Sequence, residues 1–441
     1  MSQYDEATLL KAAEFALDKA RQLGATAAEV GISNSHGLSV SVRQAEIETL
    51  EHNNDTGMAI TVYLGQSKAS ASTSDLRESA IAETVAMACS IAKFTQADEF
   101  AGLPDKSLLA TEFPDLSLYH PWDISPDKAI ELAMQCEQAG RDFSSQITNS
   151  EGASVSTHQG RRVYANSLGF AGSTQSSRHS IGCTLIAQDK KGMQRDYWYD
   201  QARDANDLQD ATFIGRRSAE RTLSRLNAKE VKTGQYSVLF AAEMASSLFG
   251  QLISAIRGGA QYRQASFLLD AKGQQIFPEF MHIHEQPHIQ KAMGSANFDG
   301  EGVATKARDI IQNGVLQGYV LDSYSARKLN TTTTGNAGGV HNLTIDSGDL
   351  DFAGLLKQMD RGVIVTETMG MGSNIVTGDY SQGAAGFWVE NGEIQHAIDE
   401  FTIAGRLQDM FMGIQSVGND IDLRGNTRSG SVLIDRMTVA A

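Results

Sequence analysis

Helix-like and strand-like spacings of apolar residues follow one another along the first hundred residues. The three- and four-residue spacing over 9–20 predicts a helix that ends at Gly24. Apolar and polar residues alternate over 38–43, and 58–64 is strongly apolar, so both predict strands. The second strand leads into a further strand of small residues, 67–76, and helical spacing returns over 77–94.

The next segment, 99–124, has the character of a linker, because it carries three prolines and no sustained period. Ser125-Pro126-Asp127 then predicts a helix start: a capping hydroxyl, a proline in the first turn and an acidic residue near the positive end of the helix dipole. A further helix is predicted over 207–226.

Between these two helices, residues 146–203 show only short strand-like runs. Turn signals occur at Gln159-Gly160, at Ser167-Leu168-Gly169 and at Lys190-Lys191-Gly192. The pattern therefore predicts a meander of short antiparallel strands.

The last third of the chain is rich in strands and glycine. It begins with an apolar strand over 236–241 and a helix over 243–257. Asn313-Gly314 and Asn391-Gly392 lie between apolar runs and predict type I′ hairpin turns. Seventeen glycines fall between 331 and 441 among apolar strand runs, which indicates a closed or strongly curved sheet.

Together these patterns predict an α+β protein of three domains. An α/β-type N-terminal domain is expected over 1–105, and a strand-rich domain that begins with a helix over 106–232. The third, over 233–441, is a glycine-rich C-terminal domain with a barrel-like, mostly antiparallel sheet.

Composition narrows the possible partners and location. The chain has 441 residues and a formal net charge of −16, which argues against direct binding to nucleic acid. We expect neither a signal peptide nor a membrane span. Three separated cysteines, Cys89, Cys136 and Cys183, fit a reducing cytoplasm and no disulfide framework.

One short motif suggests a metal site. His284-Glu285-Gln286-Pro287-His288 matches HExxH, in which two histidines on one helical face bind zinc and the glutamate activates water. Pro287 disfavours the helix that this chemistry needs. The sequence before it alternates like the end of a strand, so a polar junction between strand and turn is favoured over a self-contained zinc site.

Other clusters have plain structural interpretations. Arg216, Arg217, Arg221 and Arg225 recur on one side of the predicted helix 207–226 and are read as a solvated helix face. No GxSxG sequence marks a nucleophilic serine. Residue types alone therefore identify no active site.

Four longer segments carry a family resemblance. They are GMAITVYLGQSKASASTSD (57–75), Tyr324–Leu329 with TGNAGGVHN (334–342), TGDYSQGAAGFWVENGEI (377–394) and VGND (417–420). The chain resembles the TldD/PmbA family over essentially its whole length, and is most similar to the PmbA branch, also called TldE. An older family name is modulator of DNA gyrase.

The resemblance implies a role in peptide hydrolysis. The family pairs TldD and PmbA subunits in a cytosolic heterodimeric metallopeptidase that acts on unfolded or modified peptides. In TldD the metal lies on an HExxxH helix after the first C-terminal strand, with a cysteine as a further ligand. The matching positions here are Ala242, Glu243, Ser247 and, near the C-terminus, Ser429. A methyl group and two hydroxyls cannot replace imidazoles and a thiolate on zinc.

The resemblance therefore predicts a subunit without catalytic, cofactor or metal residues of its own, with zinc in the TldD partner. The subunit is expected to shape a groove for extended peptides, and the segments 67–74 and 370–388 would contribute to that groove. Two alternatives stay open: a self-contained zinc peptidase using His284, Glu285 and His288, and a non-enzymatic peptide-binding regulatory module. A homodimer of the isolated chain is also possible, and the role of Glu243 is undetermined.

Overall fold

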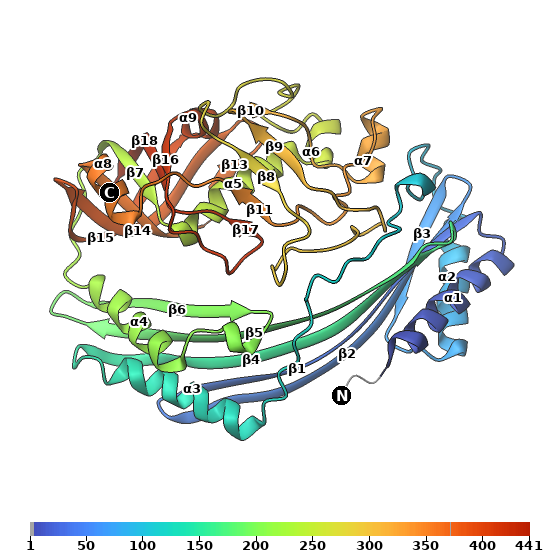
Figure 1. The fold of residues 1–441 in the computed structure, drawn as a ribbon, viewed down its shortest axis with the longest axis horizontal. Coiled ribbons are helices and arrows are strands. Elements are labelled where there is room, and N and C mark those ends of the chain that lie inside the picture. The colour runs from blue at the N-terminus through green and yellow to red at the C-terminus, as the bar shows by residue number, and fades with distance from the viewer. Residues whose placement is uncertain (1–3, 371) are drawn as a thin grey trace.

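The computed structural model describes residues 4–370 and 372–441. Its first half forms one long, bent sheet, and its second half forms a C-terminal domain that lies over the concave side of that sheet (Figure 1). Helices pack on the opposite, convex side of the sheet, two near each end (Figure 1).

The long sheet has six antiparallel strands in the order β3-β2-β1-β4-β5-β6. The strands are β1 (Ala27–Arg43), β2 (Glu46–Leu64), β3 (Ser67–Thr73), β4 (Ile147–Asn166), β5 (Ala171–Gln188) and β6 (Met193–Ala202). The helices of this half are α1 (Glu6–Gln22), α2 (Glu78–Ala92), α3 (Pro126–Arg141) and α4 (Ala211–Ser224), with short 3₁₀ turns at Lys106–Leu108 and Ala205–Asp207.

The alternation along β1 explains why one sheet carries two separate cores. Val30 and Ile32 pack with α1 and α2 at one end of the strand. Val40 and Val42 pack with α3 and α4 at the other end. Because side chains alternate between faces, residues such as Glu29 and Ser33 point to the concave side, toward the C-terminal domain.

The C-terminal domain contains a closed five-stranded barrel. Strands β12, β7, β18, β15 and β14 follow one another, and pairing of β12 with β14 closes the ring. Only β7 and β12 pair in parallel among these strands. A second sheet has the order β10-β9-β8-β11-β17, and α5 packs into the core between barrel and sheet.

The strands of this domain are β7 (Gly234–Phe240), β8 (Ile283–Glu285), β9 (Arg308–Gln312), β10 (Val315–Leu316), β11 (Leu343–Ile345), β12 (Gly362–Met369), β13 (Ser373–Asn374), β14 (Asp379–Glu390), β15 (Glu393–Arg406), β16 (Ile414–Val417), β17 (Thr427–Arg428) and β18 (Val432–Ala440). The helices are α5 (Ala242–Ile256), α6 (Gly258–Tyr262), α7 (Ser323–Lys328), α8 (Phe352–Met359) and α9 (Leu407–Met412).

The predicted fold class is confirmed, including the barrel-like sheet. Both Asn-Gly pairs form the expected hairpin turns, with positive φ at Asn313, Gly314, Asn391 and Gly392. The predicted capping of the helix that starts at Pro126 is also observed, because the Ser125 hydroxyl accepts a hydrogen bond from the amide of Lys128 at 3.3 Å.

One predicted turn is wrong. Gln159-Gly160 does not interrupt a short strand but lies inside β4, paired on one side with β1 and on the other with β5. Pairing with long neighbours on both sides outweighs a local turn preference, so the predicted meander consists of long strands. The turns at 167–169 and 190–192 do connect strands, as expected.

The three proposed domains are not equally separate. Strands from 1–105 and from 106–232 form one continuous sheet, with β1 next to β4. The segment 99–124 crosses from this sheet to the C-terminal domain, where Leu109 forms a bridge with Val303. None of the helices in the described part of the chain has the length and apolar character needed to cross a bilayer.

Candidate functional site

The largest candidate site is cavity 1, which has a volume of about 830 Å³ between the concave sheet face and the C-terminal domain. Its floor comes from β1, β2, β4 and β5, and its opposite wall from the loops 293–301 and 337–341. Gly31, Ser33 and Ser35 line it from β1, at alternate positions of the strand. The small side chains on these strands are what leave this space between sheet and loops.

Carboxylates give cavity 1 its chemical character. Both Glu29 oxygens accept tyrosine hydroxyl hydrogen bonds, from Tyr63 at 2.9 Å and from Tyr164 at 2.7 Å. On the opposite wall, burial raises the pKa of Glu301 to about 7 although the Ser323 amide donates to it. Burial also raises the pKa of Asp299. Cavity 1 therefore contains two carboxyl groups, Glu301 and Asp299, whose ionised forms are disfavoured by burial.

Cavity 2 is smaller, about 470 Å³, and lies where the sheet's outer strand β6 and helix α4 face the start of α5. Its walls include Asp196 and Trp198 from β6, Arg221 from α4, and Glu243 from the first turn of α5. Phe387 of β14 contributes an apolar side. Glu243 in this cavity belongs to the segment that the sequence resemblance aligns with the TldD metal helix.

Arg221 and Arg225 of α4 each form one ion pair across this boundary, with the C-terminal half of the chain, and one with Asp196 of β6 in their own half. Arg221 Nη1 lies 2.7 Å from Glu243 Oε1, and its Nε lies 3.3 Å from Asp196 Oδ1. Arg225 Nη2 lies 2.6 Å from Glu367 Oε2, and its Nε lies 2.7 Å from Asp196 Oδ2. These arginines are mostly buried, and the carboxylates come from three different elements.

The interpretation of the arginine run as a solvated face is therefore wrong for two of its members. Arg216 and Arg217 are exposed, but the side chains of Arg221 and Arg225 are only 15% and 12% exposed. The reason is long-range: their acidic partners lie on β6, α5 and β12, which the spacing along α4 cannot reveal.

The residues that the sequence resemblance aligns with the TldD ligands do not offer the donors of a zinc site. Ala242 has no donor atom, and the Glu243 carboxylate is paired with Arg221. The Ser247 hydroxyl donates to the carbonyl of Met244 at 2.7 Å, and that of buried Ser429 donates to the carbonyl of Gly430 at 2.9 Å. Neutral hydroxyls engaged with backbone carbonyls offer none of the nitrogen or thiolate ligands that zinc requires.

The HEQPH run is not helical. His284 and Glu285 lie in strand β8 and point to opposite sides. Glu285 is buried and accepts hydrogen bonds from Arg308 and Asn336 and from the His341 amide, at 3.0, 2.7 and 2.6 Å. His288 lies 3.2 Å from the Thr305 hydroxyl. The structure thus separates the three groups that the zinc-peptidase alternative would bring together, as the strand interpretation predicts.

The two predicted groove segments lie apart from cavity 1. Residues of 67–74 line neither cavity, and from 370–388 Phe387 lines cavity 2. Met371, in the glycine-rich part of that prediction, lies outside the described residues. Sequence reasoning did not single out Glu29 or Glu301. The alternation of Glu29, Gly31 and Ser33 with apolar neighbours was the signal that could have placed Glu29 on an open sheet face.

Comparison with protein families explains this architecture. The chain matches the models of PmbA/TldA metallopeptidase domain 1 over 28–92, the central domain over 119–226, and the C-terminal domain over 233–441. The chain belongs to the PmbA/TldD family of metallopeptidases. The family assignment that the four sequence segments suggested is thereby confirmed.

Similar proteins place the chain on the PmbA side of this family. It is 49% identical to metalloprotease PmbA of Escherichia coli O157:H7 over 94% of this chain and 92% of that protein. A Bacteroides thetaiotaomicron crystal structure, described as a candidate modulator of DNA gyrase, superposes with a TM-score of 0.93. That match has 28% identity and covers 98% of both chains.

The fold also matches a solved structure of a TldE protein. TldE from Thermococcus kodakarensis superposes with a TM-score of 0.86 at 20% identity, covering 98% of this chain and all of that one. At that identity the likeness establishes the shared fold. The family name supports peptide hydrolysis as the reaction with which this chain is concerned.

Proposed function

We propose that this chain is the non-catalytic subunit of a cytosolic heterodimeric metallopeptidase. A TldD-type chain would supply the zinc and the hydrolytic residues, and this chain would shape the space that receives the peptide. What supports the proposal is the donor chemistry at the start of α5: the residues that the sequence resemblance aligns with the metal positions offer a methyl group, an ion-paired glutamate and a hydroxyl bonded to a backbone carbonyl.

Cavity 1 is the part of this chain that we assign to peptide binding. Its volume falls in the range of sites for small molecules and short peptide segments, so a folded domain would be excluded. Polar groups such as Glu29, Ser33 and Asp299 line it and can satisfy the main chain of an extended peptide. Such recognition depends little on side-chain sequence, which suits unfolded substrates.

The cytosolic location has separate support. Cys89, Cys136 and Cys183 are all buried and unpaired, as thiols in a reducing compartment are. The net charge of −16 supports peptides rather than nucleic acid as ligands.

The decisive experiment is reconstitution with a TldD-type subunit. Hydrolysis of an unfolded peptide is measured for the TldD-type chain alone, for this chain alone, and for their mixture. We expect activity in the mixture well above that of either chain. A mixture no faster than the TldD-type chain alone would refute the subunit role, and robust hydrolysis by this chain alone would refute its non-catalytic character.

A paired substitution tests the role of cavity 1 within that complex. Ser33→Trp places a bulky ring in the cavity, whereas Ser154→Trp introduces the same ring at another exposed serine of the same sheet, outside both cavities. We expect Ser33→Trp to reduce hydrolysis by the mixture at least tenfold without preventing assembly, and Ser154→Trp to leave it near wild type. Equal rates for both variants would remove cavity 1 from the proposal.

A further inference from the structure

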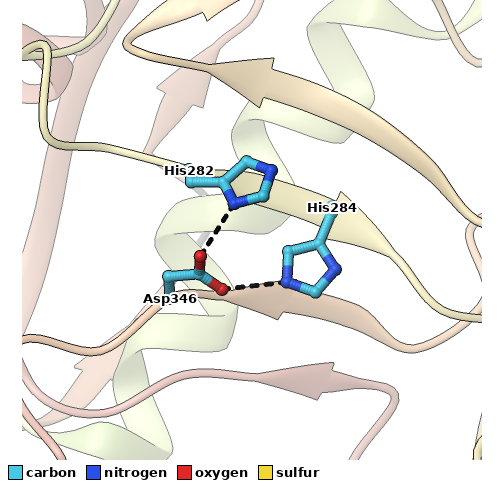
Figure 2. A group of neighbouring side chains, drawn as sticks. All are labelled: His282, His284 and Asp346. Carbon is cyan, nitrogen blue, oxygen red and sulfur yellow. Dashed lines mark hydrogen bonds and ion pairs between the residues drawn. The ribbon is translucent and has the colours of Figure 1, made fainter.

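Two imidazoles and a carboxylate converge on β8 and the end of β11, two neighbouring inner strands of the small C-terminal sheet (Figure 2). His282 and His284 are two residues apart at strand β8, so their side chains leave the same face of the strand. Asp346 directly follows β11, the antiparallel neighbour of β8, and its amide donates to the carbonyl of His282 at 3.1 Å. Backbone pairing therefore fixes all three side chains relative to one another.

The donor atoms of this cluster face a common point. His282 Nδ1 lies 2.7 Å from Asp346 Oδ2, and His284 Nε2 lies 2.9 Å from Asp346 Oδ1 (Figure 2). One ligand atom from each of the three residues lies within 4.8 Å of the others. The two rings stack with their centroids 4.9 Å apart, which keeps both nitrogens directed at the carboxylate.

Each imidazole also has a partner on its other nitrogen. His282 Nε2 lies 2.8 Å from Asp309 Oδ1, and the Gln286 side-chain nitrogen Nε2 donates to His284 Nδ1 at 2.8 Å. The Asp309 carboxylate can accept only from a protonated His282 Nε2, and this tautomer of the neutral ring directs Nδ1 toward Asp346 as a possible metal ligand. This arrangement orients histidine ligands in metal sites.

We propose that His282, His284 and Asp346 bind a divalent transition-metal ion of the zinc class, with Asp309 as a positioning residue for His282. Two neutral imidazoles and one carboxylate are a donor set that zinc accepts in sites that keep a further position open. The charges of Asp346 and Asp309 together balance a doubly charged ion. The side chain of Asp346 is 50% exposed, so an ion has access from solvent.

This site is independent of the proposed peptidase function. None of its three ligands lines cavity 1 or cavity 2, and none of them belongs to α5. It departs from the sequence-based expectation that this chain holds no metal. It also differs from the HEQPH alternative, because His284 is used with His282 and Asp346 while Glu285 and His288 point elsewhere.

The test is direct titration of the purified, tag-free, chelator-treated full chain with Zn²⁺ alone, by calorimetry and by metal analysis after dialysis. We expect saturable binding of one ion per chain. His284→Ala and Asp346→Asn should weaken binding at least a hundredfold. Asp309→Asn should keep the stoichiometry but weaken binding about 10- to 100-fold, because it only orients His282.

His288→Ala is the matched control, since it removes the other histidine of the HEQPH run and should bind Zn²⁺ like the wild type. Co²⁺ provides a second readout: its visible absorption should appear in the wild type and in His288→Ala and be absent from Asp346→Asn. The melting temperature should rise with Zn²⁺ only where the ion binds, which also shows that each variant is folded.

Three results would overturn the site. They are the absence of saturable Zn²⁺ binding by the wild-type chain, unchanged binding in both His284→Ala and Asp346→Asn, and loss of binding in His288→Ala. Any of them would leave the cluster as an ion-paired network only. Should His284→Ala fail to fold, His282→Gln replaces it, since it keeps a polar side chain at the same strand position.

Discussion

Glu301 is the residue of cavity 1 whose charge is most sensitive to its surroundings. Burial raises its pKa from the ordinary 4.5 to about 7, and the negative charges of Asp299 and Asp322 act in the same direction. The amide of Ser323, 3.0 Å from Oε2, only partly offsets this. At pH values between 4.5 and 7 the folded chain therefore holds a proton here that the unfolded chain has largely released.

This difference predicts that Glu301 makes folding less favourable as pH rises. Between about pH 4.5 and 7 the folded state binds more protons at this site, so the free energy of unfolding falls across that window and the loss is complete above it. The full effect is roughly 3 kcal/mol by linkage. Glu301→Gln should remove it and stabilise the chain at pH 8 but hardly at pH 4.5, as measured by urea unfolding at both values.

Exposed Glu14 on α1 supplies the control, because Glu14→Gln should change stability little and equally at both pH values. An unchanged free energy of unfolding for Glu301→Gln at pH 8 would mean that the Glu301 carboxylate is solvated better than its burial indicates.

At the scale of elements, α3 and α4 cross in close contact in the sheet half. Two glycines make it possible. A Cβ at Gly140 would lie 2.7 Å from the carbonyl oxygen of Gly215, and a Cβ at Gly215 would overlap the carbonyl oxygen of Cys136. The backbones of the two helices thus touch directly, and the core formed by Cys136, Ile214 and Leu185 depends on that approach.

Gly215→Ala should therefore destabilise the chain by about 1–3 kcal/mol, since the helices must separate to admit one methyl group. Gly250 in α5 is the matched control: it is also inside a helix, but a Cβ there meets nothing within 4 Å. Gly250→Ala should stabilise by roughly 0.5–1 kcal/mol through helix propensity. In thermal unfolding, the melting temperature should fall for Gly215→Ala and rise for Gly250→Ala. Equal changes in the two melting temperatures would contradict the close crossing of α3 and α4.

Elements were predictable from the sequence where local chemistry decides them. The Asn-Gly turns and the Ser125 cap form through residues adjacent in sequence, and both occur as expected. The turn predicted at Gln159-Gly160 does not form, because pairing with β1 and β5 overrides the local turn signal. The same limit applies to Arg221, whose partners Asp196 and Glu243 lie on other elements.

The candidate sites show this limit most clearly. His282 and His284 were visible as a two-residue spacing on a strand end, but Asp346 and Asp309 reach them only through pairing of β8 with β11 and β9. Cavity 1 likewise needs the C-terminal loops to lie over the sheet, which no local pattern indicates. The family resemblance indicated membership of the PmbA/TldD family, which no local pattern could indicate, because the resemblance extends over the whole chain.

At the scale of the whole molecule, the two halves are joined by a few specific polar contacts. The Arg327 guanidinium of α7 donates to the carbonyls of Phe100, Gly102 and Leu103, at 2.6, 2.8 and 3.1 Å. Nearby, the Tyr324 hydroxyl donates to Asp98 at 2.7 Å. These bonds attach the start of segment 99–124 to the C-terminal domain and so help to set the position of the loops over cavity 1.

Removing the guanidinium should release that segment before the rest of the chain unfolds. Arg327→Ala breaks three charge-assisted hydrogen bonds, and a loss of about 3 kcal/mol in local stability is expected. Exposed Lys106 lies in the segment, so trypsin should cleave after Lys106 several-fold faster in the variant. Cleavage after Lys191, in the turn between β5 and β6, serves as an internal reference and should keep its rate.

Arg263→Ala, which removes an exposed arginine of the same domain, should change neither rate. If Arg327→Ala instead accelerated both cleavages equally, the whole chain would be unfolding as one unit and Arg327 would contribute to global stability. Unchanged cleavage after Lys106 would mean that the remaining contacts, including the Leu109–Val303 bridge, hold the segment without it. Selective cleavage would show that the sheet half and the barrel half are linked through a segment that opens locally.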